Sequence, residues 1–261
     1  MKLQVLLSTM SQNDTSILSK MNIQSDIIIV NQCDRNHFDQ YTYNGNSVKC
    51  LSLAERGIGI SRNTALMRAT ADICLFADDD VSYVDNYASI IVEEFNKYLN
   101  ADILLFNVCS TNPKRSLYNI QRRSRVRFFN CLRYGAVMMA IRTEKVRKAN
   151  VYFSLLFGGG AKYSAGEDSL FLAECIRKGL KVYAIPKRIG YVSQEESTWF
   201  NGYTEKYFID KGVFYSNLSN RWASLLCFQF AVRHKKMFSQ EKNVLEVLRL
   251  MRKGRDIFKY S

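Results

Sequence analysis

Residues 75–83 read LFADDDVSY, an apolar run that ends in three consecutive aspartates. Such a run is typical of a buried strand, and loops diverge around a ligand crevice at the carboxyl end of a parallel strand. Side chains alternate along a strand, so we expect Asp78 and Asp80 on one side and Asp79 on the other. Two carboxylates ~4 Å apart repel by about 1 to 4 kcal/mol, which favours a bound cation. The alternative is a solvated turn before the next helix, because aspartate favours helix N-caps.

Similar apolar runs alternate with helical patterns on both sides of this stretch. They predict strands at residues 3–7, 26–30, 48–51, 73–77, 102–106, 136–141 and 180–185. Helical periodicity predicts helices at residues 59–69, 84–98 and 166–178, and only helices beyond residue 206. This alternation is typical of an α/β fold with a mostly parallel sheet flanked by helices. We place a boundary at residue 218, between a domain of residues 1–218 and a basic amphipathic helical C-terminal segment of residues 219–261.

Composition indicates a folded globular chain. Of its 261 residues, 47% are hydrophobic and 13% aromatic, which is enough apolar material for a substantial core. The seven cysteines occur singly and without any CxxC pair, which fits a reducing compartment and argues against a zinc knuckle. The N-terminus does not resemble a signal peptide, and no apolar stretch reaches the ~20 residues that a spanning helix needs. These features predict a cytoplasmic protein.

The net charge of +13 is concentrated in two regions. Seven basic residues and no acid lie between residues 103 and 142, and ten basic residues face three acids from Arg221 to Ser261. Two basic regions on an otherwise near-neutral chain indicate anionic partners, namely phosphates, nucleic acid or an acidic leaflet.

Two further segments accompany the aspartates: ERGIGISRNTAL at residues 55–66 and GGGAKYSAGEDSLFLAECIRKGLKVYAIP at residues 158–186. With them, the chain resembles a family 2 glycosyltransferase of the bacterial surface-polysaccharide type over about residues 1–212. That family pairs a glycine-and-RN segment, a DxD-type aspartate cluster that ends the fourth strand, and an acidic ED pair that opens a later helix. The resemblance implies the glycosyltransferase A-type fold, with a Rossmann-like sheet and here a C-terminal helical appendage.

The resemblance also implies roles for the acidic residues. Asp168 would be the catalytic base, with Glu167 beside it to order the loop or meet the acceptor. Such a base is needed because a sugar hydroxyl is a poor nucleophile. Attack from the face opposite the diphosphate would invert the anomeric centre. The alternative is that Glu167 and Asp168 only charge the first turn of a helix, where acids meet the helix dipole favourably.

The donor and metal residues follow from the same resemblance. Asp80 would bind Mn²⁺ or Mg²⁺, with Asp78 at the metal or the nucleotide sugar and Asp79 beside them. A metal neutralises the charge that develops on a leaving diphosphate. Gln194 stands where many relatives have a third metal ligand, a histidine. Asn31, Asp34 and Arg62 would contact the nucleotide; Asn31 replaces the usual acid, and Arg62 has a solvated helical arginine as its alternative.

The acceptor side is predicted less sharply. Gly159, Gly160 and Trp199 are expected to meet the acceptor, although a Trp in a chain of this length is more often simply a core residue. Acceptors in the family are often anionic lipid diphosphate-linked sugars. The C-terminal helices would then dock on an anionic membrane surface, which predicts a peripheral enzyme on the inner face of the cell membrane. Alternatively, the apolar face of the last helix packs on the catalytic domain or on a second subunit in a homodimer.

The resemblance therefore implies an inverting, metal-assisted hexosyltransferase. It would move a sugar from a nucleotide diphosphate sugar, UDP-linked in our prediction, to a hydroxyl of a glycan or lipid-linked acceptor in capsule or other surface polysaccharide synthesis. Two alternatives remain: a nucleic-acid-binding protein that uses its basic regions, although it shows no recognition motif, and a nucleotidyltransferase that acts on sugar phosphates. The nucleotidyltransferase alternative lacks a glycine-rich, basic phosphate loop near the first strand, because the LLSTMSQND segment there has neither glycine nor lysine.

Overall fold

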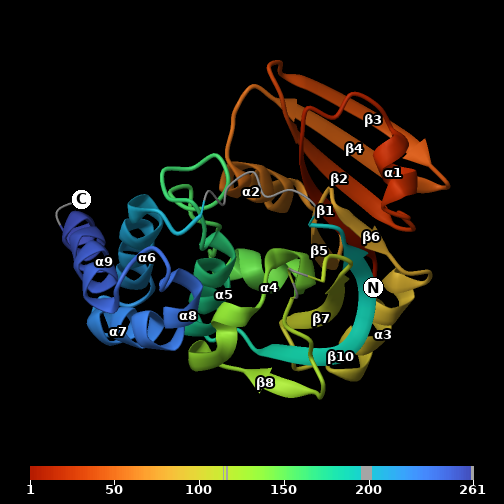
Figure 1. Cartoon of the computed structure of the whole chain (residues 1–261). Helices are drawn as coiled ribbons and strands as arrows, with labels where there is room; N and C mark the ends of the chain where they lie inside the picture. The colour runs from red at the N-terminus through yellow and green to blue at the C-terminus, as the bar shows by residue number, and fades with distance from the viewer. Residues whose placement is uncertain (114, 116, 195–201, 260–261) are drawn as a thin grey trace. The chain divides into compact units, whose positions relative to one another are not determined.

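The computed structural model describes residues 1–113, 115, 117–194 and 202–259 (Figure 1). Ten strands within these ranges form one sheet in the order β3-β4-β2-β1-β5-β9-β7-β10-β6, with β8 paired to β10. The strands are β1 Leu3–Met10, β2 Asp26–Gln32, β3 His37–Tyr43, β4 Asn46–Leu53, β5 Ile73–Asp78, β6 Val81–Tyr83, β7 Ile103–Ser110, β8 Ser124–Val126, β9 Met139–Arg142 and β10 Val182–Val192. The predicted α/β class is confirmed.

The sheet is mixed rather than parallel throughout. Strands β4, β2, β1 and β5 run parallel to one another, as do β7 and β10. Strand β9 lies between β5 and β7 and is antiparallel to both. The carboxyl ends of β1, β2 and β5 therefore lie at one edge of the sheet, where a ligand crevice is expected. Asp78 ends β5 at that edge.

Helices cover the sheet as the alternation predicts. The helical segments that accompany it are α1 Ser16–Lys20, α2 Ile58–Arg68, α3 Tyr87–Lys97, α4 Thr143–Lys148 and α5 Glu167–Arg177, with 3₁₀ turns η1 Phe128–Arg133 and η2 Ala136–Met138. The predicted strand at residues 136–141 divides, since residues 136–138 form η2 and only the rest enters β9. Helix α2 packs on β1 and β2, which brings the SRN segment to the edge where Asp78 lies.

Strand β3 is absent from the sequence predictions. It pairs with β4 in a hairpin whose turn residues, Asn44 and Gly45, both have positive φ. An Asn-Gly pair of this kind is typical of a type I′ hairpin turn. The HFDQYTY sequence of β3 is largely exposed at the sheet edge, so it lacks the apolar run by which the other strands are recognised.

Contacts divide the chain into two compact units. The sheet unit comprises Met1–Leu155 and Glu167–Ser197, and the helical unit comprises Leu156–Gly166 and Thr198–Ser261. The helical unit contains α6 Glu205–Leu218, α7 Ala223–Arg233, α8 Lys235–Phe238 and α9 Val244–Lys259. The predicted boundary at residue 218 therefore falls inside the helical unit, because α6 packs on α9.

Two glycines let α6 and α9 approach closely. A Cβ on Gly212 of α6 would collide with the Met251 carbonyl of α9, and a Cβ on Gly254 would collide with the Ile209 carbonyl. Met251 and Val247 are fully buried, so the apolar face of α9 is covered within the helical unit. Across the described ranges, no helix is both long and apolar enough to span a bilayer. All seven cysteines are free thiols.

Candidate active site

Arg62 of α2 lies at the centre of the candidate site and is only 3% exposed. Its Nη1 donates to Asp168 Oδ1 at 2.6 Å and to Glu167 Oε1 at 3.0 Å. Its Nη2 donates to Asp78 Oδ1 at 3.0 Å. The predicted base, its acidic neighbour and the first aspartate of the triplet therefore meet at one guanidinium. The sequence placed these residues in different roles, and the structure brings them together.

The SRN segment explains how Arg62 is positioned. Asn63 Nδ2 donates to the Phe153 carbonyl at 2.9 Å, and the Phe153 N–H donates back to Asn63 Oδ1 at 2.8 Å. Gly59, four residues earlier, lies so close to the Ser154 carbonyl that a Cβ there would collide with it. The Phe153 ring centroid lies 5.3 Å from the guanidinium carbon of Arg62. Helix α2 is thus fixed against residues 153–154, which aims Arg62 at the carboxyl groups.

The Arg62 guanidinium binds the carboxyl groups of Asp78, Glu167 and Asp168, and the pKa values of Arg62, Asp78 and Glu167 are raised. Burial raises the pKa of Glu167 to about 8, and the charge of Asp168 adds to the increase while Arg62 opposes it. Burial also raises the pKa of Asp78, against the attraction of Arg62. Burial alone would lower the pKa of Arg62, but Asp78, Asp168 and Glu167 raise it above its usual value. Burial, with the charge of Asp168, therefore favours the protonated form of Glu167 up to a higher pH than for a free glutamate.

Asp168 is held at both carboxylate oxygens. Arg62 binds Oδ1, and Oδ2 accepts a hydrogen bond from the backbone N–H of Ala136 at 3.0 Å. The side chain is still 26% exposed, whereas that of Glu167 is 12% exposed. Because each carboxylate oxygen has two lone pairs, a fixed and partly open Asp168 can still accept a proton.

The other two aspartates of LFADDDVSY lie beyond the end of β5, so a turn and not strand alternation separates the three side chains. Asp79 Oδ2 accepts a hydrogen bond from the Thr9 hydroxyl at 2.6 Å. Asp80 has a pKa raised to about 6, first by burial and then by Asp78 and Asp79, while a hydrogen bond from the Gln194 backbone opposes the shift. The charge of Asp80 is thus poorly balanced by the protein alone.

Gln194 follows β10 and lies beside this turn. The Ser193 N–H donates to the Asp80 carbonyl at 3.1 Å, and the Gln194 carbonyl accepts from Asn112 Nδ2 at 3.1 Å. Gln194 has a φ of 49°, and its side-chain Oε1 is buried without a hydrogen-bond donor. A buried acceptor without a donor near a carboxyl group of raised pKa is an environment that a hard cation fits. Groups of three or more His, Cys, Asp or Glu that could hold a metal do not occur in the described ranges, and an amide ligand falls outside that set.

The predicted nucleotide contacts Asn31, on β2, and Asp34, just after it, already have partners within the protein. Asn31 is buried, and its side-chain amide exchanges two hydrogen bonds with the backbone of Gln12, at 2.9 and 2.8 Å. Asp34 is exposed and pairs with Arg56 Nη2 at 2.6 Å. Asn31 thus fixes the loop after β1, and each polar atom of its amide keeps one further bonding position.

The predicted acceptor residues lie apart in the chain from these groups. Gly159 and Gly160 belong to the helical unit, where Gly160 has a φ of 78°. Trp199 lies outside the described residues. Of the residues that the sequence predictions missed, Thr9, Gln12 and Arg56 bind predicted site residues directly. Only Arg56 had a sequence signal, because it directly precedes the glycines of the SRN segment.

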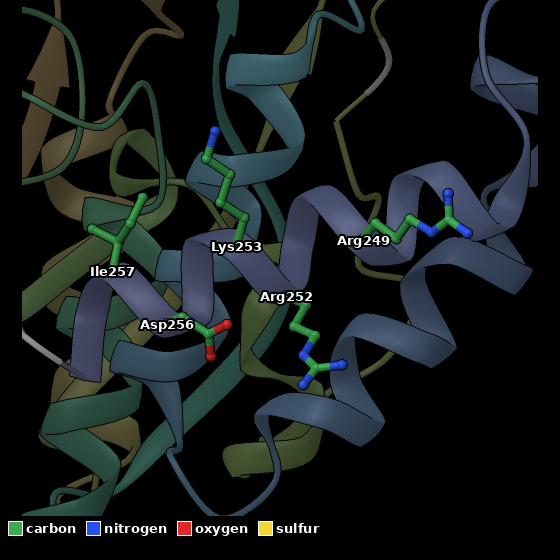
Figure 2. Close-up of a pocket in the computed structure, with 5 residues that line it drawn as sticks. All are labelled: Arg249, Arg252, Lys253, Asp256 and Ile257. Atoms are coloured by element: carbon green, nitrogen blue, oxygen red, sulfur yellow. The ribbon is translucent and has the colours of Figure 1, made fainter.

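A shallow pocket of about 560 Å³ occurs elsewhere in the chain, on the last helix (Figure 2). It is lined by Arg249, Arg252, Lys253, Asp256 and Ile257, all of α9. In Figure 2 the side chains of Lys253 and Arg252 project from opposite sides of the helix. Its lining includes none of the motif residues, so pocket volume does not mark the candidate active site.

The family model of glycosyl transferase family 2 matches residues 11–152, more than half of the chain. The chain belongs to glycosyl transferase family 2. The predicted family is therefore confirmed, and the protein is a glycosyltransferase. The match ends before Glu167 and Asp168, so the contact of both residues with Arg62 adds an observation that the family match does not contain.

The fold of this glycosyltransferase is similar to that of S. aureus TarS. The crystal structure of TarS residues 1–349 with UDP-GlcNAc matches with a TM-score of 0.66 and 17% identity, over 94% of this chain and 77% of that one. The same TarS fragment with UDP gives a TM-score of 0.63 at 17% identity, over 94% and 77% of the two chains. A longer TarS structure also gives 0.63 at 17% identity, but only 46% of it is covered. These matches confirm the glycosyltransferase A-type fold. No curated protein matches the sequence.

Proposed function

We propose that this glycosyltransferase transfers a hexose from a nucleotide diphosphate sugar, UDP-linked, to a hydroxyl of a glycan or lipid-linked acceptor with inversion. The observation that carries the proposal is the Arg62 cluster, which joins Asp78 to Glu167 and Asp168. Asp78 ends β5 at the sheet edge where α/β proteins bind ligands. Donor-binding and proton-accepting groups are therefore connected through one side chain.

The donor's diphosphate is placed beside the aspartate turn. Asp80, Asp78 and Gln194 would hold a Mn²⁺ or Mg²⁺ ion, of which the carboxylate and amide oxygens are suitable ligands. When bound, the ion neutralises the charge that develops on the leaving diphosphate. Asp79 supports the turn through Thr9, and Asn31 and Asp34 flank the nucleotide. The UDP assignment is supported by the TarS structures with UDP-GlcNAc and UDP, whose fold is similar.

Asp168 accepts the proton of the attacking hydroxyl. Arg62 and the Ala136 N–H fix both of its oxygens, and its partial exposure lets the acceptor reach it. Burial raises the pKa of Glu167 and favours its neutral form, which supports Asp168 rather than Glu167 as the base. Attack on the face opposite the diphosphate inverts the anomeric carbon. Gly159, Gly160 and Trp199 remain the proposed acceptor contacts.

The acceptor is proposed to be a glycan or lipid diphosphate-linked sugar of surface polysaccharide or capsule synthesis. Such acceptors are anionic and reside at the inner face of the cell membrane, which places the enzyme as a peripheral protein there. The basic segment of residues 103–142 supports an anionic acceptor. Several of its arginines lie over aromatic rings of the chain itself, as Arg123 does over Tyr98 at 4.2 Å and Arg125 over Tyr183 at 4.8 Å. Those ring faces are thus in use within the fold, which disfavours base stacking on nucleic acid.

The test is nucleotide release from a panel of nucleotide sugars, with and without Mn²⁺. We expect UDP release from at least one UDP-sugar, stimulated by the metal and by added glycan or lipid-linked acceptor. Isothermal titration with UDP alone provides a second readout that does not require the correct acceptor. Failure to bind any nucleoside diphosphate, together with salt-sensitive binding of RNA or DNA, would overturn the proposal.

A further inference from the structure

The apolar stripe of α9 that contains Val247 and Met251 is covered inside the helical unit. Val247 and Met251 are fully buried, and the glycine contacts bring the α9 backbone against α6. What α9 exposes is mainly charged, with Arg249, Arg252 and Lys253 beside Asp256, and its exposed apolar side chains Leu245 and Ile257 are 12 residues apart and form no continuous stripe. A membrane contact by the C-terminal helices therefore requires a different apolar surface.

Helix α7 carries such a surface, here called the α7 face. Its large apolar side chains are about half exposed: Trp222 48%, Leu225 56%, Phe228 54% and Val232 53%. Their spacing of three, three and four residues places them along one side of a helix. The opposite side of α7 is buried, through Ala223, Cys227, Phe230 and Ala231. Helix α7 is thus apolar on both sides and buried on only one.

The charge along the α7 segment itself has a single sign. No acid occurs from Arg221 to Gln240, and the four cations there are Arg221, Arg233, Lys235 and Lys236, all exposed. Arg221 lies next to Trp222, and Arg233 next to Val232, so cations stand at both ends of the apolar stripe. Contiguous exposed apolar surface rimmed by polar groups is typical of an interaction site.

We propose that the α7 face is the surface by which this protein lies on an anionic lipid leaflet. Phe228, Leu225 and Val232 enter the acyl boundary, Trp222 lies at the headgroup level, and the flanking cations meet lipid phosphates. Apolar insertion combined with a basic rim is the pattern of helices that lie in a membrane interface. Tryptophan suits the boundary because its ring is apolar and its N–H is polar.

Charge distinguishes the lipid from a second copy of the chain. In a symmetric dimer the same patch occurs on both subunits, so the cations around one α7 face would lie opposite those of the other. Like charges placed across an interface oppose association. An anionic leaflet complements the same cations. The inference specifies the surface for the peripheral location proposed above and rests on that location; its test needs no transfer reaction, so its failure leaves the transferase proposal intact.

The test is co-sedimentation of the full chain with sucrose-loaded vesicles of phosphatidylcholine and phosphatidylglycerol, and with phosphatidylcholine alone. The double variant Leu225→Ser, Phe228→Ser removes apolar area without changing charge, and Leu99→Ser is the matched control, since Leu99 is a 75% exposed leucine in the sheet unit. Burial of each large apolar side chain is worth roughly tenfold or more in affinity, so we expect the double variant to bind anionic vesicles at least about tenfold more weakly. Leu99→Ser should bind as the unmodified protein does.

Each other outcome overturns the inference. Unchanged binding by the double variant would mean that charge alone attracts the protein, and absence of binding by the unmodified chain would remove the membrane contact. Sedimentation velocity without vesicles measures the oligomeric state of both proteins. A dimeric unmodified protein and a monomeric double variant would show that the α7 face binds a second copy of the chain. Circular dichroism of each variant confirms that the substituted, exposed positions leave the fold intact.

Discussion

At the scale of single residues, the partners of Arg62 separate the roles of the two adjacent acids. The sequence predicts that Arg62 contacts the donor nucleotide, and in the structure its two Nη atoms bind Asp78, Glu167 and Asp168 while its buried Nε has no hydrogen-bond partner among the described residues. In the proposed mechanism, Arg62 positions these carboxyl groups and is linked to the donor through Asp78. Burial raises the pKa of Glu167, whereas Asp168 accepts hydrogen bonds from Arg62 and from the Ala136 N–H.

Replacement of the proposed base should separate binding from transfer. We expect Asp168→Asn to bind UDP with the affinity of the unmodified enzyme and to lose about 10²- to 10⁴-fold in kcat, because an amide cannot accept the proton. Isothermal titration and UDP release measure the two effects. Glu205→Gln, at the exposed start of α6, is the control and should change neither. Undiminished turnover by Asp168→Asn would remove the residue from the role of base.

The raised pKa of Glu167 predicts a pH dependence of stability. An unfolded glutamate releases its proton near pH 4.5, whereas Glu167 in the folded protein retains it up to about pH 8. Between these pH values the folded state holds more protons than the unfolded state, so raising the pH favours unfolding. The free energy of unfolding should therefore fall as the pH rises through this window. Glu167→Gln lacks the titration, so it should become more stable relative to the unmodified enzyme as the pH rises.

Urea unfolding at about pH 5.5 and about pH 8.5 measures this difference. Glu174→Gln is the matched control on the same helix, since Glu174 is 40% exposed and pairs only at the surface with Arg177. An equal stability difference between Glu167→Gln and the unmodified enzyme at both pH values would show that Glu167 is ionised throughout.

At the scale of elements, the buried strands could be predicted from the sequence and an exposed strand could not. The buried strands β1, β2, β5 and β7 were predicted from their apolar runs, with ends that extend by one to four residues in the structure. The exposed β3 was missed, because its sequence is polar and only its Asn-Gly turn signals a hairpin. The antiparallel β9 was predicted as a strand, but its direction depends on partners β5 and β7, which no local pattern specifies.

The residues of the candidate site could be predicted from the sequence, but the hydrogen bonds between them could not. The aspartate triplet, the SRN segment and the ED pair were each found by their residue types. The bond from Thr9 to Asp79 spans 70 residues, and the bond from Arg62 to Asp168 spans 106. Contacts over such separations depend on strand order and helix packing, so residue type and local spacing could not reveal them.

The close crossing of α6 and α9 predicts a steric effect. Gly212→Ala places a Cβ against the Met251 carbonyl, which cannot move without shifting the helix. We expect a loss of about 1 to 3 kcal/mol in the free energy of unfolding, as overpacking typically costs. Gly159→Ala is the control in the same unit, because nothing lies within 4 Å of its added Cβ. Urea denaturation measures both, and equal stability of the two variants would contradict the crossing.

At the scale of the whole molecule, donor and metal should stabilise the fold together. A ligand that binds only the folded state at about 100 times its Kd adds roughly 2.7 kcal/mol to the free energy of unfolding. We expect UDP with Mn²⁺ to raise Tm more than UDP alone. Asp80→Ala should abolish the Mn²⁺-dependent part, because Asp80 is the proposed metal ligand. Asp256→Ala, on the exposed face of α9, should retain the full shift; a full shift in Asp80→Ala would exclude Asp80 from the metal site.

The spacing of the partners of Arg62 has a consequence for how the enzyme is made. Asp78 lies 16 residues beyond Arg62, whereas Asp168 lies 106 beyond it. At roughly 5 to 20 residues per second, a ribosome adds the proposed base about 5 to 20 s after Asp78. During that interval the nascent chain contains the arginine and its donor-side carboxylate, but no group to accept the proton. The cluster of three carboxyl groups around Arg62 therefore cannot form on the nascent chain until α5 has been made.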